Sequence, residues 1–171
     1  MNPRSPRAHR GPLALAAVAA GLALAGTAVA VLPPAAAADM CSPDSLYVVK
    51  GRLEGAAGSR FLTVKLTNVG DETCSAGTAT KAAFRDWSGP LGVKGALSAG
   101  SGAVTLDPGE TATTVVHWSD PGPVPADDCQ EAAATLVTVR VPSLKHTWRI
   151  PLQAAVCTTF EYRPDSEPLT S

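Results

Sequence analysis

Four cysteines are the residues of this chain whose type and spacing most directly suggest chemistry. Thiols at Cys41, Cys74, Cys129 and Cys157 would either hold a metal ion or form two disulfide bonds. Structural zinc sites bring their ligands in close pairs separated by about two to four residues, whereas the gaps here are 33, 55 and 28 residues. The spacing therefore predicts two disulfides and no metal site.

The pairing of the cysteines is less constrained by the sequence. Four cysteines allow three connectivities, and sequence alone does not decide among them. We favour Cys41–Cys74 with Cys129–Cys157, because each bond then joins the start of a strand to a nearby element. Closing a loop of about 30 residues stabilises a fold by roughly 3–4 kcal/mol in the chain-entropy model. The inter-sheet cystine of antibody domains is disfavoured, because no cysteine falls in the middle of a clear strand.

Residues 1–38 have the three parts of an export signal, which fits a protein that forms disulfides. Positive residues without acidic ones come first, an apolar run follows, and small residues precede a cleavage point. These parts are Arg4, Arg7 and Arg10, residues 13–32, and Ala36-Ala37-Ala38 before Asp39. We expect a cleaved signal and a mature chain that is secreted or associated with the cell envelope. An uncleaved anchor is the alternative, because the apolar run is about as long as a bilayer span.

The charge balance of the predicted mature chain argues against a nucleic-acid partner. The full chain has 14 Lys and Arg residues and 15 Asp and Glu residues, and three arginines but no acidic residue lie in the signal. The mature chain therefore carries 11 basic and 15 acidic residues, a net charge near −4. A mildly acidic domain is poorly suited to a phosphate backbone. After residue 38 no apolar run is long enough to predict a membrane span.

Candidate catalytic and cofactor groups are sparse. His117 and His146 are the only histidines after the signal; they could pair across a sheet to bind a metal or sense pH, but we interpret them as ordinary strand residues. A cupredoxin site needs two histidines and a methionine near a cysteine, and the residues after Cys157 contain neither type. No serine stands in a nucleophile elbow, and the adjacent Asp127 and Asp128 do not form a carboxylate pair across a cleft. The sequence predicts no catalytic residue and no cofactor.

Three tryptophans remain as candidates for packing or contact. Trp118 and Trp148 lie in strand patterns, so we expect them in the core. Trp87 instead stands between Arg85-Asp86 and the turn Ser88-Gly89-Pro90, where an exposed ring could contact a sugar or a protein partner. Because buried tryptophan is common in β-sandwiches, the sequence favours core packing for Trp87 and keeps ligand contact as the alternative.

Strand patterns account for nearly all of the mature chain. Residues 60–69, 111–118 and 135–141 alternate with a period of two, and Gly, Pro and Asp separate them from shorter candidates. The shorter candidates are 46–50, 81–87, 92–95, 104–106, 146–152 and 155–159. About seven to nine short strands at this spacing predict an all-β, immunoglobulin-like antiparallel β-sandwich, with a closed barrel as the alternative. We expect one domain over 39–160, a helical turn at 130–134, and a flexible polar tail over 161–171.

A series of motifs resembles a known exported family. The residues run from Cys41 through Thr67-Asn68-x-Gly70-x-x-Thr73-Cys74 and Leu106-x-Pro108-Gly109 to Cys129 and Cys157. Their order is similar to the actinobacterial family known as domain of unknown function 4232. The resemblance implies an immunoglobulin-like sandwich, secreted or held at the envelope, and carries no catalytic residue. The run Cys74-Ser75-Ala76-Gly77 departs from the family, which usually has Leu, Gly, an aromatic residue and Pro there.

These features together predict a non-enzymatic module that binds a partner or serves a structural role outside the cytoplasm. Such a module would meet three classes of partner: a cell-wall polymer, a surface protein or a secreted protein. Trp87 is the residue that we expect to contact the ligand if its ring is exposed. A hydrolase or metal-dependent enzyme built from scattered His and Asp residues is the alternative.

Overall fold

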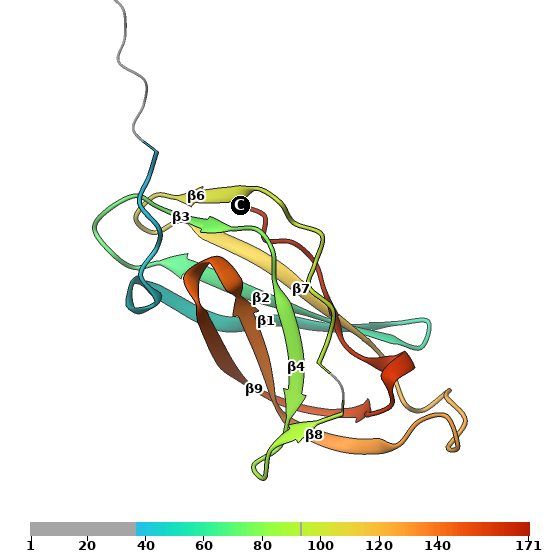
Figure 1. The fold of residues 1–171 in the computed structure, drawn as a ribbon. Coiled ribbons are helices and arrows are strands. Elements are labelled where there is room, and N and C mark those ends of the chain that lie inside the picture. Colours follow the sequence, from blue (N-terminus) through green and yellow to red (C-terminus); the bar gives the residue numbers. More distant parts are fainter. Residues whose placement is uncertain (1–36, 93) are drawn as a thin grey trace, which may run out of the picture. The chain divides into compact units, whose positions relative to one another are not determined.

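Ten β-strands make up most of the regular structure in the computed structural model, which describes residues 37–92 and 94–171 (Figure 1). In chain order the strands are β1 (Leu46–Ala56), β2 (Ser59–Asn68), β3 (Cys74–Gly77), β4 (Lys81–Arg85), β5 (Pro90–Leu91), β6 (Ala103–Leu106), β7 (Thr111–Ser119), β8 (Glu131–Val141), β9 (His146–Cys157) and β10 (Asp165–Ser166). Three 3-10 helices of three residues each complete the elements: η1 (Pro43–Ser45), η2 (Pro142–Leu144) and η3 (Phe160–Tyr162). The predicted signal, 1–38, lies outside the described residues except for its last two.

The strands form two four-stranded antiparallel sheets and one two-stranded sheet. The first sheet has the order β1-β2-β7-β10, and the second has the order β5-β4-β8-β9. Strands β3 and β6 pair antiparallel as the small sheet. The predicted all-β antiparallel sandwich is confirmed. The structure has more strands than the seven to nine expected, since β5 and β10 are only two residues long and give no periodic signal.

Alternating side chains explain why the two large sheets pack face to face. On β2 the inward residues Leu62, Val64 and Leu66 are almost fully buried. On β8 the inward residues Val137 and Val139 are likewise buried. A strand sends successive side chains to opposite faces, so one side of each sheet removes apolar surface from water and the other remains accessible.

The core lies between the two large sheets. Phe84 of β4 meets Trp118 of β7 edge to face, with ring centroids 5.3 Å apart. Trp118 is 1% exposed, which confirms its predicted core position, whereas Trp148 is only partly buried and packs against the core from its margin. Packed aromatic rings of this kind tie one sheet to the other.

Several local predictions need correction. Residues 130–134 do not form a helical turn; β8 begins at Glu131, and the preceding turn is closed by the Asp128 and Cys129 amides on the Pro125 carbonyl. The segments predicted as strands at 146–152 and 155–159 are one strand, β9, whose register with β8 shifts between Ala134 and Leu136. This bulge disrupted the alternation that would have revealed one continuous strand. Of the strand predicted at 92–95, the described residues Gly92, Lys94 and Gly95 are not in a strand.

The predicted flexible tail at 161–171 is wrong for most of its length. Strand β10 pairs with the edge of β7, and Leu169 is 2% exposed. The Thr170 and Thr113 backbones exchange hydrogen bonds of 2.7 and 2.9 Å. The Glu167 carbonyl accepts from the Thr114 hydroxyl at 2.6 Å. The polar, proline-bearing composition suggested disorder, but one buried leucine and backbone pairing along β7 order the segment.

Candidate functional site

The four cysteines form two disulfides with the favoured pairing. Cys41 bonds Cys74 and Cys129 bonds Cys157, with Cα–Cα distances of 4.8 and 4.9 Å. The first joins the segment before β1 to the start of β3, and the second joins the loop before β8 to the end of β9. Disulfides of this kind indicate an oxidising environment outside the cytoplasm.

The histidines do not come together. His117 lies on β7 and stacks on Phe61 at 4.8 Å, whereas His146 lies on β9 beside Trp148 at 4.7 Å. Strands β7 and β9 belong to different sheets. Over residues 37–92 and 94–171, no three His, Cys, Asp or Glu side chains are grouped to hold a metal ion.

The sequence prediction was wrong for Trp87. Core packing was the favoured prediction, but the side chain is 83% exposed. It lies in the hairpin between β4 and β5, where the chain turns away from the sandwich. The four-residue loop from Asp86 to Gly89 leaves the ring no interior to enter, and the core position next to this strand is already filled by Phe84.

A network centred on one carboxylate holds the Trp87 hairpin. Asp86 accepts hydrogen bonds from the Ser88 hydroxyl at 2.7 Å, the Ser88 amide at 2.8 Å and the Gly89 amide at 2.8 Å. The Asp86 amide in turn donates to the Gly89 carbonyl at 3.0 Å. The Ser88 hydroxyl, followed by the Gly89 amide, lowers the pKa of Asp86 below its ordinary value. Trp87 is therefore presented to solvent by a loop with a defined conformation.

A shallow cavity of about 200 Å³ lies beside the Trp87 ring. Its lining combines the indole with polar and apolar side chains from three strands: Lys50, Thr135, Pro151, Leu152 and Gln153. An aromatic face next to hydrogen-bonding groups is the combination that binds a sugar ring or a flat polar ligand.

A second candidate surface lies on the outer side of the β4-β8-β9 sheet. Ala82, Phe84, Val137, Val139 and Ile150 face the core, so the residues between them face outward. The register aligns Lys81 with Arg140 and Thr147, and Ala83 with Thr138 and Arg149. We call the cationic residues of this surface the basic face: Lys81, Arg85, Lys94, Arg140 and Arg149.

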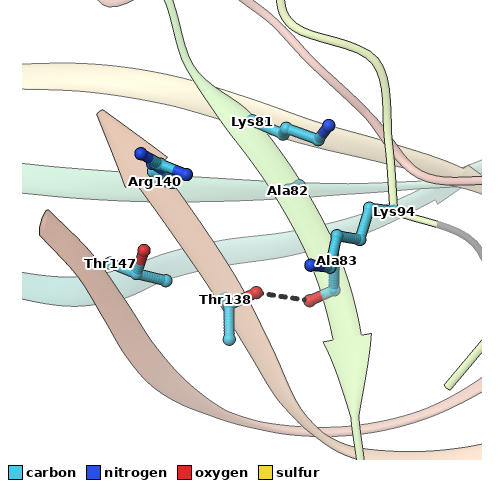
Figure 2. A pocket seen from close by; sticks show the side chains of 7 residues that line it. All are labelled: Lys81, Ala82, Ala83, Lys94, Thr138, Arg140 and Thr147. Atoms are coloured by element: carbon cyan, nitrogen blue, oxygen red, sulfur yellow. Dashed lines mark hydrogen bonds between the residues drawn. The ribbon is translucent and has the colours of Figure 1, made fainter. Parts of the chain in front are cut away.

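A cavity of about 190 Å³ occupies the middle of the basic face. Figure 2 shows Lys81 and Arg140 on neighbouring strands, with Lys94 reaching in from the loop after β5. The floor is neutral, because the other lining residues, Ala82, Ala83, Thr138 and Thr147, carry no charge. The Thr138 hydroxyl donates to the Ala83 carbonyl at 3.0 Å and fixes that floor. The arrangement suits a small anionic group.

The charge of the basic face is not balanced by ion pairs. The two ion pairs among the described residues are Arg52–Glu54 and Arg60–Asp120, and neither involves the basic face. The segments 81–85, 136–140 and 147–151 contain no acidic residue, and Asp86, which follows Arg85, accepts its hydrogen bonds from Ser88 and Gly89. The predicted mature chain, with its net charge near −4, therefore still gathers five cations on one face.

The sequence prediction missed the basic face because charge was summed over the whole chain. The signal was present in two segments: the outward positions of 81–85 and 137–141 carry Lys81, Arg85 and Arg140 opposite buried apolar neighbours. Joining them to Arg149 and Lys94 requires the order of strands in the sheet, which a single sequence does not contain.

Comparisons with known proteins identify the family of the chain. The helices of the described residues are single short turns, and none is long or apolar enough to cross a membrane. A search among curated proteins finds no match. The family model described as "Domain of unknown function (DUF4232)" matches residues 41–167, which begins at the first disulfide cysteine and includes β10. On this match over most of its length, the chain belongs to the DUF4232 family.

Proposed function

We propose that the protein is an exported, non-enzymatic binding module whose contact with its partner includes Trp87. The single observation that carries the proposal is the 83% exposure of this tryptophan in a hairpin of fixed conformation. The predicted signal, with cleavage before Asp39, would deliver the module to the cell surface or the medium. The disulfides support that location.

The energetics of Trp87 support a contact role. A tryptophan carries a large apolar surface that gains free energy when a partner covers it, and tryptophan is enriched among the residues that dominate binding energy. Three hydrogen bonds to Asp86 already order the loop. A partner therefore meets a preorganised side chain and does not have to order the loop itself.

A cell-wall polymer is the partner class that the surroundings of Trp87 favour over a surface or secreted protein. The cavity beside the ring is shallow and combines Lys50 and Gln153 with Pro151. An indole face flanked by polar groups binds a sugar ring by stacking and hydrogen bonding. A purely structural role in the envelope would not need an exposed ring on a rigid loop.

The alternative of a hydrolase or metal-dependent enzyme has less support. General acid–base or metal chemistry needs side chains that converge on one substrate. His117 and His146 belong to different sheets; His117 stacks on Phe61, and the His146 ring lies tilted beside Trp148. The two imidazoles therefore do not converge on one substrate.

Sedimentation with cell walls tests the proposal. The full chain, expressed with its own N-terminal segment and recovered after export, is mixed with insoluble walls of the organism that encodes it. We expect the protein to sediment with the walls, and Trp87→Ala to weaken this binding by about tenfold or more. Tyr47→Ala is the matched control, because Tyr47 is another exposed aromatic residue, 61% accessible, on a different strand. Intact mass of the exported protein checks that it begins at Asp39 with two disulfides.

Equal sedimentation of the native protein and Trp87→Ala would overturn the role of this residue. Absence of any binding to walls, together with hydrolysis of a wall component that is lost in His117→Ala or His146→Ala, would favour the enzyme alternative.

A further inference from the structure

We propose that the basic face binds an acidic polysaccharide through ion pairs between its cations and anionic groups on successive sugars. This inference rests on the proposed binding function and gives it a ligand class. The carrying observation is the group of five cations, Lys81, Arg85, Lys94, Arg140 and Arg149, on one outer side of the β4-β8-β9 sheet, none of them in an ion pair among the described residues.

The central cavity accounts for one anionic group of the ligand. Lys81, Lys94 and Arg140 line a space of about 190 Å³ with a neutral floor (Figure 2). An arginine side chain donates two parallel hydrogen bonds to a carboxylate or phosphate, and a lysine adds a compact positive charge. A single carboxylate, sulfate or phosphate group fits the volume and can meet more than one of these donors.

The remaining cations require a ligand with more than one anionic group. Lys81 and Arg85 are four residues apart on β4, which corresponds to about 13 Å along a strand. The β4, β8 and β9 strands add about 10 Å across the sheet, and Arg149 lies on the far one. A small ion in the cavity is too short to contact Arg85 and Arg149 as well. A polymer with anionic groups at intervals is long enough to contact them.

The unpaired charges are themselves unfavourable in the free protein. Lys81 and Arg140 stand directly opposite each other on paired strands, and like charges in such positions destabilise a sheet. Neither belongs to an ion pair within the described part of the chain. An anionic ligand would attract both cations and would also offset the repulsion between them, and both effects favour its binding.

One feature favours a polysaccharide over the other polyanions. Trp87 follows Arg85 by two residues and offers a ring for sugar stacking at the end of the same strand. A nucleic-acid duplex and an anionic lipid surface do not present the face of a sugar ring for such stacking.

Binding to defined oligosaccharides tests this inference. The probes are an octameric oligouronate, the same octamer with its carboxyl groups reduced to alcohols, and a wall glycopolymer with phosphodiester groups. We expect the exported protein to bind at least one anionic probe, to bind the reduced octamer at least about tenfold more weakly, and to lose affinity as salt screens the charges. The two anionic probes distinguish carboxylate from phosphate as the recognised group.

Matched variants locate the site. The double variant Lys81→Gln/Arg140→Gln removes one lysine and one arginine from the cavity and should weaken binding of the anionic probe by about tenfold or more. The control Lys65→Gln/Arg52→Gln makes the same change in net charge on β2 and β1, at exposed positions of the other sheet. It should bind like the native protein. Circular dichroism and intact mass verify that both variants are folded and disulfide-bonded.

Several results would overturn the inference. They are equal loss in the two double variants, equal binding of the reduced octamer, and tighter binding to a DNA duplex or to anionic lipid vesicles. The proposed function can fail separately: loss of wall binding in Trp87→Ala but not in Lys81→Gln/Arg140→Gln supports the module and rejects the basic face. If the native protein does not bind walls but still binds the oligouronate, the result rejects the proposed wall-binding module and supports the basic face.

Discussion

The outer faces of the two large sheets differ in chemistry, although each lies on a pair of antiparallel strands, β2 and β7 in one sheet and β4 and β8 in the other. The outward residues of β2 and β7 include four threonines, Thr63, Thr67, Thr111 and Thr113, which we call the threonine face. Three of the four hydroxyls pair with each other or with the tail: those of Thr67 and Thr111 lie 2.8 Å apart, and those of Thr113 and Thr170 lie 3.4 Å apart. Lys65 is the one lysine or arginine at the outward positions of β2 and β7, whereas the basic face gathers five such cations, none of them in an ion pair among the described residues.

This difference between the outer faces fits the proposed ligand site on the basic face. The inward residues of both sheets serve the same core, so the outward residues are free to vary. Threonine favours strands and satisfies its hydroxyl locally. Clustered positive charges contribute nothing to a sheet and repel each other. Where residues are unfavourable for the local structure in which they lie, a binding site is the expected reason.

The largest effect that we expect is a loss of stability when the tail, which completes the sheet of the threonine face, is altered. Leu169→Ala should lower the free energy of unfolding by about 2–5 kcal/mol, because it leaves a cavity under a buried side chain. Denaturant unfolding measures the change. Oligouronate binding by the variant, measured where it remains folded, should match that of the native protein, because the basic face lies on the other sheet.

The matched control is Leu97→Ala, since Leu97 is 54% exposed and should change the stability little. Similar stability losses at the two leucines would mean that the tail does not pack in solution as the structure places it.

Much of the fold could be predicted from local signals. The alternation at 60–69 and 111–118 marked β2 and β7 to within a residue, and both disulfides were paired as favoured. Pro108-Gly109 forms a turn of the kind that a proline followed by a glycine favours, with Gly109 at φ 85° and the Glu110 amide donating to the Asp107 carbonyl. In each case neighbouring residues carry the information.

The errors arose where tertiary contacts decide the outcome. Composition made 161–171 resemble a free tail, yet the β7 edge offered backbone partners and the core accepted Leu169. Trp87 was expected in the core because tryptophan usually is, but a tight hairpin turns it outward. The basic face depends on which strands are neighbours, so only part of the candidate site could be recognised before the sheet order was known.

A smaller effect tests whether the basic face is unfavourable for folding. Lys81→Gln should raise the free energy of unfolding by a few tenths of a kcal/mol, because it removes repulsion from Arg140 on the paired strand. Denaturant unfolding at low and high salt measures it, and screening should shrink the gain. The same variant should bind the oligouronate more weakly, so stability and binding would change in opposite directions.

The control for this effect is Lys65→Gln on the β2 strand. Lys65 faces Val49 and Thr113 across its strand pairs, so no like charge stands opposite it. Its replacement should not stabilise the protein. A gain equal to that of Lys81→Gln would show that lowering positive charge anywhere is enough, and would remove the contrast between the two faces.

The smallest expected effect is confined to the Trp87 hairpin at the end of the basic sheet. Hydrogen bonds lower the pKa of Asp86 in the folded protein. A depressed folded pKa contributes stability above the ordinary carboxyl pKa, near 4, and this contribution is lost as pH falls through the folded value. The hairpin should therefore be ordered at neutral pH and loosen in acid. The threonine pairs carry no titrating group and should not respond.

Nuclear magnetic resonance can separate these two behaviours residue by residue. The Ser88 and Gly89 amide protons donate to Asp86 at 2.8 Å, so their chemical shifts should titrate at a pH below the ordinary carboxyl value, together with the Trp87 indole signal. Trp87→Phe identifies that signal by its absence. Asp86→Asn keeps an acceptor oxygen but no charge, and should abolish the titration. A midpoint at or above the ordinary carboxyl pKa would mean that the carboxylate does not hold the loop, and that Trp87 is not presented in a fixed position.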